Sequence, residues 1–223
     1  MAVGAFVFAY FVLFPTSSPE RFSLSDSTPS TSTGSSDASA SGSTGRWTVS
    51  SGSQAGYRVR EKLAFLSAKS DAVGRTSALT GAATLSGGGS AVTITAASFK
   101  ADVSTLKSDK DMRDQRIHQI GLESDRYPTA TFKLARPLKL PASASSGRVV
   151  RVTTTGDFTI HGTTKRKRVP MQLRLSGSKL EATGAITFPW GDFGMTAPSV
   201  GSFVQVDDTA TMEFDLRLQR AAS

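Results

Sequence analysis

Residues 150–175 read VRVTTTGDFTIHGTTKRKRVPMQLRL, and this stretch decides the fold class. One set of alternating positions from Val150 to Ile160 carries the large apolar side chains, the other set is polar, and the alternation resumes at Val169. Side chains of a β-strand point alternately to opposite faces, so each half is predicted to be a strand with one dry face. The four cations at 165–168 are expected in the hairpin between them.

The same period of two returns in six further segments. They are 54–62, 73–85, 92–96, 130–134, 180–188 and 210–218. Strands separated by turn residues are typical of an antiparallel sandwich or barrel, and one dry face per strand favours a closed barrel. Residues 108–122 differ, because Met112, Arg116 and Ile120 recur four apart after an acidic opening, which predicts a short helix. The expected fold is all-β, an eight-stranded antiparallel barrel with one short helix.

Three zones of composition divide the 223 residues. Residues 1–14 are apolar and uncharged but short for a transmembrane helix, so we expect a truncated membrane anchor or signal. Residues 15–45 are rich in Ser and Thr, without apolar periodicity, and are expected to form a disordered linker. Residues 46–223 are expected to form the barrel. An apolar run before a Ser/Thr-rich stalk favours an extracytoplasmic location, membrane-tethered or secreted.

The predicted barrel is basic, since residues 46–223 contain 25 Lys and Arg against 15 Asp and Glu. This surplus favours anionic partners, although scattered surface cations more commonly serve solubility. Cations are not interleaved with aromatic residues on one face, so no nucleic-acid partner is predicted. The absence of cysteine excludes disulfides, thiolate metal sites and cysteine nucleophiles.

Catalytic motifs are absent from the sequence. The chain contains two histidines and none of the GxSxG, HExxH or GxxxxGK[ST] patterns. Asp109, Asp111 and Asp114 resemble the start of a calcium loop, but Asp114 stands where that loop needs glycine. We therefore expect no enzyme activity, no cofactor and no metal site.

An eight-stranded barrel has room for its own side chains or for one small ligand. The side chains expected to face this interior share the dry parity of their strands. They are Ile94, Phe132, Leu134, Val152, Phe158, Ile160, Met171, Leu173, Ile186, Phe188, Met212 and Phe214. Small residues on the same faces, such as Gly156 and Gly184, either open a lumen or relieve crowding where strands bend. Periodicity alone leaves both alternatives open.

Four motifs follow one another along the chain. They are TLKSDKDMRDQ at 105–115, YPTATFKL at 127–134, GDFTIHGTTK at 156–165 and GDFGMTAPSVGSFVQVDD at 191–208. In this order they resemble the YceI-like family of lipid- or polyisoprenoid-binding barrels, over about residues 47–220. The resemblance implies a lipocalin-like barrel that holds a long isoprenoid chain in its lumen and performs no catalysis.

The resemblance also assigns positions. The family-motif residues are Arg113, Asp114, Tyr127, Pro128, His161, Gly162, Asp192, Phe193 and Gly194. Three cations, Arg166, Lys167 and Arg168, stand where the family commonly continues with Pro-Val after the lysine. Together with Lys165 they are expected to form a basic rim for an anionic head group or membrane surface. The expected function is non-enzymatic binding of a long lipid, as carrier or by sequestration. The alternative is a ligand-free structural or stress-related interaction domain.

Overall fold

The structure is a computed structural model that describes residues 18–25, 44–64, 69–88, 91–199 and 201–221. The apolar segment at 1–14, expected to be an anchor or signal, lies outside these ranges. Within the described ranges, none of the helices has the length and apolar character of a membrane span.

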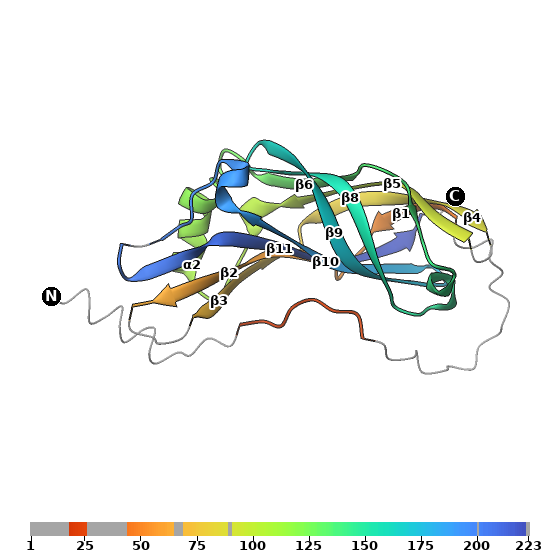
Figure 1. Ribbon diagram of the computed structural model, residues 1–223, viewed down its shortest axis with the longest axis horizontal. Helices are drawn as coiled ribbons and strands as arrows, with labels where there is room; N and C mark the ends of the chain where they lie inside the picture. Colours follow the sequence, from red (N-terminus) through yellow and green to blue (C-terminus); the bar gives the residue numbers. More distant parts are fainter. Residues whose placement is uncertain (1–17, 26–43, 65–68, 89–90, 200, 222–223) are drawn as a thin grey trace.

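The described residues form eleven strands and a few short helical elements (Figure 1). The strands are β1 Gly45–Val49, β2 Gln54–Leu63, β3 Ser70–Thr76, β4 Leu79–Gly88, β5 Ala91–Asp102, β6 Thr129–Leu134, β7 Leu138–Lys139, β8 Val150–Ile160, β9 Thr163–Ser176, β10 Lys179–Pro189 and β11 Val204–Arg220. The helical elements are η2 Val103–Thr105, α2 Asp111–Arg116, its π-helical continuation η3 Ile117–Gly121, η4 Ala142–Ser146 and η5 Trp190–Phe193.

Eight of the described strands close an antiparallel barrel in the order β1-β4-β5-β6-β8-β9-β10-β11, because β11 pairs again with β1. The carboxyl end of the long strand β11 pairs with β1, and the rest of the same edge pairs with β2. Strand β3 pairs with β2 and lies outside the closed ring. The predicted fold class is confirmed. Its strand list needed three changes, because β1 and β7 were not predicted and segment 73–85 is divided between β3 and β4.

The hairpin between β8 and β9 differs from the expected one. Its turn consists of His161 and Gly162, with φ angles of 52° and 69°, and such a two-residue turn with positive φ matches the twist of the flanking strands. Strand β9 therefore begins at Thr163, and the four cations at 165–168 lie inside it, opposite residues 155–158 of β8. The prediction that they occupy a turn was wrong, because a two-residue turn leaves no room for them.

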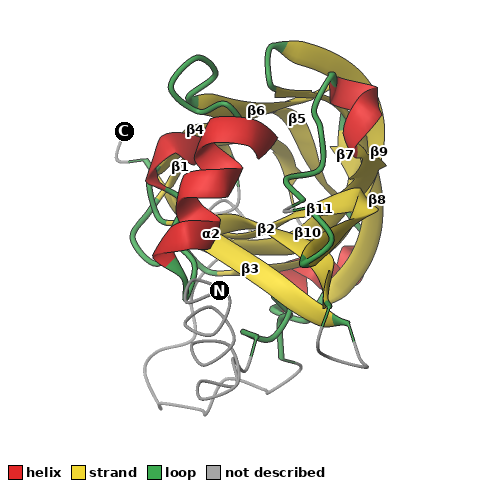
Figure 2. Cartoon of the chain, turned by 90° about the vertical axis from the view of Figure 1, so that its left-hand side faces the viewer, coloured by secondary structure: helices red, strands yellow, loops and turns green. Residues whose placement is uncertain are grey.

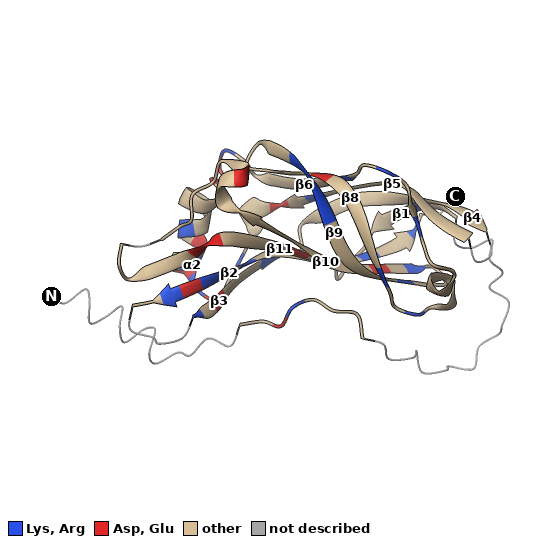
Figure 3. Cartoon of the chain, in the orientation of Figure 1, with Lys and Arg blue, Asp and Glu red and all other residues tan. Residues whose placement is uncertain are grey.

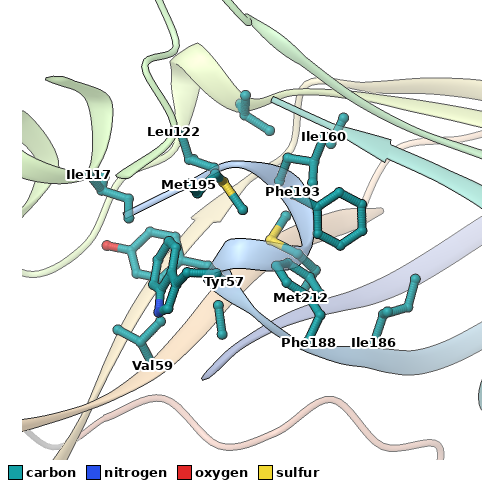
Figure 4. Close-up of a cluster of buried hydrophobic side chains, with 14 of the residues drawn as sticks. Tyr57, Val59, Ile117, Leu122, Ile160, Ile186, Phe188, Phe193, Met195 and Met212 are labelled. Carbon is teal, nitrogen blue, oxygen red and sulfur yellow. The ribbon is translucent and has the colours of Figure 1, made fainter. Parts of the chain in front are cut away.

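The predicted short helix is present and lies across one end of the barrel (Figure 2). At this end η2, η3 and η5 contribute to the helix-end cluster of buried residues, which includes Ile117, Ile186, Phe188 and Phe193 (Figure 4). A second group at the opposite end, the far cluster, is built around Trp47, which is fully buried. The barrel therefore has two cores, one at each end.

Residues 18–25, which fall within the linker expected at 15–45, lie along the outer wall of the barrel (Figure 1). We call this segment the N-terminal strap; residues 26–43 lie outside the described ranges. Its contacts include Pro19 O with Arg58 Nη2 at 2.7 Å, Phe22 with the Arg75 guanidinium at 4.0 Å, Leu24 N with Gln172 Oε1 at 2.8 Å and Ser25 O with Arg174 Nη1 at 3.2 Å. Sequence composition did not indicate this docking.

An ion network lies beneath the strap, on the outer faces of β2, β3 and β11. Arg58 and Glu213 are only 4% and 3% exposed. The two Glu213 oxygens accept from Arg58 at 3.2 and 3.3 Å and from Arg75 at 3.3 Å, while Arg58 also donates to Asp71 at 3.0 Å. Buried charges are tolerated only where they are paired in this way.

Replacing Glu213 by Gln is expected to lower the free energy of unfolding by about 3 kcal/mol or more, because Arg58 then keeps its buried charge without its main partner. Urea denaturation followed by circular dichroism measures this loss. Asp157→Asn is the control, since it breaks the exposed pair of Asp157 with Arg166 and should change stability little. Equal losses in the two variants would contradict the buried network.

Asp215 provides a pH test on the same outer face. Burial raises the pKa of its carboxyl, and nearby Arg217 only partly opposes the shift. A carboxyl whose pKa is raised on folding is destabilising once it ionises, so the free energy of unfolding falls as pH rises from the unfolded value of about 3.9 through the folded pKa. Asp215→Asn should therefore be more stable than the parent at pH 7 and equally stable near pH 3, in parallel thermal melts. A larger advantage at pH 3 than at pH 7 would reverse the assigned sign.

Candidate functional site

A cavity of about 100 Å³ lies inside the barrel, between the helix-end cluster and the far cluster. Its wall is almost entirely apolar. Phe158, Ile186 and Met212 border it from the helix-end cluster, and Leu216 borders it from the far cluster. The cavity thus occupies the junction of the two cores, where the packing of neither is complete.

Half of the twelve residues predicted to face the interior line this cavity. They are Phe132, Phe158, Met171, Ile186, Met212 and Phe214. The others pack elsewhere in the interior: Ile160 and Phe188 in the helix-end cluster, Ile94 and Leu173 in the far cluster, and Leu134 and Val152 against the far cluster. All twelve side chains therefore lie in or against the apolar interior, but the alternation alone does not distinguish a cavity wall from filled core.

Phe99 lines the cavity and was missed because of a β-bulge. In the pairing of β4 with β5, Leu85 lies opposite Ile94 while Thr84 lies opposite Ala96, so Thr95 is left over. An extra residue exchanges the two faces of a strand. The inward residues of β5 are therefore even-numbered before Thr95 and odd-numbered after it. A constant period of two, continued from Val92 and Ile94, places Phe99 on the outer face.

The large rings of the cavity wall lie beside glycines of neighbouring strands. A Cβ atom built on Gly156 would be 2.2 Å from the Phe132 ring, and one built on Gly184 would be 2.7 Å from the Phe214 ring. Gly81 has the same relation to Phe99, at 2.7 Å. These glycines therefore relieve crowding by aromatic rings, which answers the question that periodicity left open.

The ionisable groups around the cavity are directed to its outside or its ends. Glu213 contributes to the wall, but its carboxylate is bonded to Arg58 and Arg75 on the outer face. In the described part of the chain, no cluster of three or more His, Cys, Asp or Glu side chains could hold a metal ion. The arrangement can hold an apolar group by burial of surface.

Arg113 and Asp114, two of the family-motif residues, attach the helix to the barrel. Arg113 donates to Glu61 of β2 at 2.7 Å and to Asp109, and the buried Asp114 accepts from Ser108 N at 2.8 Å. Neither residue lines the cavity. Their contacts hold the α2 segment in place over the barrel end.

Tyr127 and His161 form a second connection at the same end. The His161 ring lies 4.3 Å from the Tyr127 ring, and its Nδ1 donates to the carbonyl of Phe193 at 3.1 Å. A Cβ atom at Gly162 would be 2.9 Å from Tyr127, so the turn also needs glycine for close packing. Pro128 follows, with its carbonyl accepting from Val103 N at 2.8 Å.

Lys167 joins β9 to the η5 turn, since it donates to Asp192 at 2.6 Å and lies 5.5 Å from the Phe193 ring. Gly194 ends that turn with a φ of 67°. Arg166 is paired with Asp157 at 2.9 Å. Figure 3 shows the cations along β9 rather than around the mouth of a loop, so the expected basic rim does not have the predicted geometry.

The family comparison agrees with this architecture. The YceI-like domain model matches residues 47–218. The chain belongs to the YceI-like domain family. A comparison with curated protein sequences gives no match.

Two solved structures show that this YceI-like domain has a known fold. A polyisoprenoid binding domain from Saccharophagus degradans is 18% identical with a TM-score of 0.61, over 80% of this chain and 99% of that chain. BcnA from Burkholderia cenocepacia is 17% identical with a TM-score of 0.52, over 73% of this chain and 95% of that chain. At these identities the likeness concerns the fold.

Gly156→Ala tests the packing of the cavity wall. The added methyl group would meet the Phe132 ring and, at 2.7 Å, the carbonyl of Lys133, so we expect a loss of about 1–3 kcal/mol in the free energy of unfolding. Gly191→Ala is the matched control, because a Cβ atom there meets nothing within 4 Å. Adding Phe132→Leu to Gly156→Ala should recover part of the loss, and strictly additive losses in denaturation experiments would refute the contact.

Proposed function

We propose that this YceI-like domain is a non-enzymatic binding protein that holds the apolar chain of a lipid, of the isoprenoid class, in its barrel lumen. The observation that carries the proposal is the apolar cavity at the junction of the two cores. A similar fold is described for a polyisoprenoid binding domain, which favours this ligand class. Carriage or sequestration of the lipid is the corresponding role.

The size of the cavity sets a condition on this function. Ligand pockets usually enclose about 300–1,000 Å³, whereas this one has about 100 Å³. A long chain therefore needs side chains of the wall to move, and Met171 and Met212 are suitable because methionine has three rotatable bonds. Short chains fit with less rearrangement.

The same small volume supports the alternative, a ligand-free structural or interaction domain. Phe158, Phe188 and Phe193 fill the helix-end core with ring centroids 4.7–5.8 Å apart. A barrel filled in this way needs no ligand for its stability. Lipid content distinguishes the two functions.

Protein purified without detergent is expected to release an apolar lipid into organic solvent, identified by mass spectrometry, and lipid-free protein should bind added geranylgeraniol. Ala101→Leu should weaken this binding at least tenfold, since each displaced CH₂ group loses about 0.8 kcal/mol of burial. Ala101 lines the cavity, whereas Ala96 of the same strand is exposed, so Ala96→Leu is the control. Absence of both extracted lipid and geranylgeraniol binding would favour the ligand-free alternative.

We also propose that the domain acts outside the cytoplasmic membrane, tethered or secreted. This proposal is supported only by the composition of residues 1–14 and 15–45. Fusions of the full chain to reporters that are active on one side of the membrane test it. Activity confined to the cytoplasmic reporter would contradict this location.

A further inference from the structure

Strands β9 and β10 separate part-way along the barrel wall. Their pairing runs from Ser176 and Lys179 to Met171 and Gly184 and ends there. Beyond this point β9 continues to Thr163, paired among the described strands with β8. Pro170, the first residue past the last pair, has no N–H group with which to continue the ladder. The wall therefore has a seam between β9 and β10.

An outer groove of about 400 Å³ lies at the same point, between the N-terminal strap and the outer faces of β8, β9 and β10. Arg21 and Phe22 of the strap form one side, and Arg151, Pro170 and Gln172 belong to the opposite side. Two residues, Met171 and Glu213, line both this groove and the lumen cavity. The inner and outer spaces thus adjoin at the seam.

The groove has the electrostatics of an anion site. Arg21 and Arg151 are exposed, and neither side chain has a hydrogen-bond or ion-pair partner among the described residues. The acidic group of the groove, Glu213, is already neutralised by Arg58 and Arg75. Guanidinium groups bind phosphate and carboxylate oxygens through forked hydrogen bonds. Arg166 and Lys167, in contrast, already have carboxylate partners.

We propose that the outer groove binds the anionic head group, a phosphate or carboxylate, of an amphiphile whose apolar chain passes through the β9–β10 seam into the lumen. The inference rests on the proposed lumen function and adds the place and charge of the head group. It replaces the predicted rim at 165–168 as the head-group site. Arg21 brings the strap into the same site, so the strap closes over the bound head.

The test uses two probes that share the same geranylgeranyl group, geranylgeranyl phosphate and geranylgeraniol. Inorganic phosphate is the third probe. The parent protein is compared with a double variant of the full chain, Arg21→Gln with Arg151→Gln. The matched control is Arg116→Gln, which replaces an exposed arginine on α2. We expect the double variant to bind geranylgeranyl phosphate about tenfold or more weakly and the alcohol unchanged within twofold. The control should bind both probes as the parent does, and the tenfold difference should shrink at high salt.

The outcomes separate the two levels of the proposal. Equal binding of geranylgeranyl phosphate by the parent and the double variant, with the alcohol still bound, overturns the head-group site and leaves the lumen function intact. Inorganic phosphate that binds as tightly as geranylgeranyl phosphate, with the same arginine dependence, indicates a site for free anions and overturns the link to the lumen. Failure of the parent to bind the alcohol removes the lumen function and the inference with it.

Met171 tests the passage itself, because it borders both spaces. A bulky ring at this position should close the junction between the two spaces. Met171→Trp is therefore expected to bind geranylgeranyl phosphate no more tightly than geranylgeraniol, so that the gain in affinity from the head group is lost. Met171→Phe serves the same purpose if a thermal melt shows that the tryptophan variant does not fold. An undiminished advantage in a folded variant would show that the chain does not pass the seam.

Discussion

The hydroxyl group of Ser53 bridges a break along the edge of β11, and the two-part architecture depends on it. Strands β1 and β2 pair with the same edge of β11 in succession, and between them Ser53 Oγ accepts from Arg217 N at 2.9 Å and lies 3.1 Å from Arg217 O. A buried backbone group without a partner would be costly. Because the hydroxyl supplies that partner, β1 can close the ring by pairing with β11. Strand β2 pairs with the next part of the same edge, outside the ring, and places β3 toward the helix end.

This division produces two cores with a junction between them. The far core fills the closed ring around Trp47, whereas the helix-end core fills the part covered by α2 and η5. Phe214 packs against both cores. Its ring has space only because Gly184 opposite it has no side chain. Glycine thus has a packing role in the wall. The positions that it leaves open for the aromatic rings determine how much space remains inside the barrel.

Much of the fold could be predicted from the sequence because the dry parity persists without interruption in β8, in β10 and in residues 210–218 of β11. The short strand β1 could not, since five residues next to a Ser/Thr-rich segment give little periodicity. Phe99 was missed because the bulge at Thr95 exchanges the faces of β5. Docking of the strap depends on partners far away in the chain, such as Arg58 and Gln172, and no local pattern encodes such contacts. None of the nine family-motif residues lines the cavity, although Phe132 and Phe158 of its wall lie within two of the four sequence motifs.

The four cations that interrupt the alternation in 150–175 lie where β9 has left β10. The unpaired edge of a strand is a template on which a second molecule can add its own strand, and natural proteins oppose this with charge and proline. Pro170 removes one donor from that edge, and Lys165 and Arg168 are exposed along it. An antiparallel approach of two such edges would bring cations against cations. The charge of this segment therefore keeps an open barrel wall from becoming a site of intermolecular sheet growth.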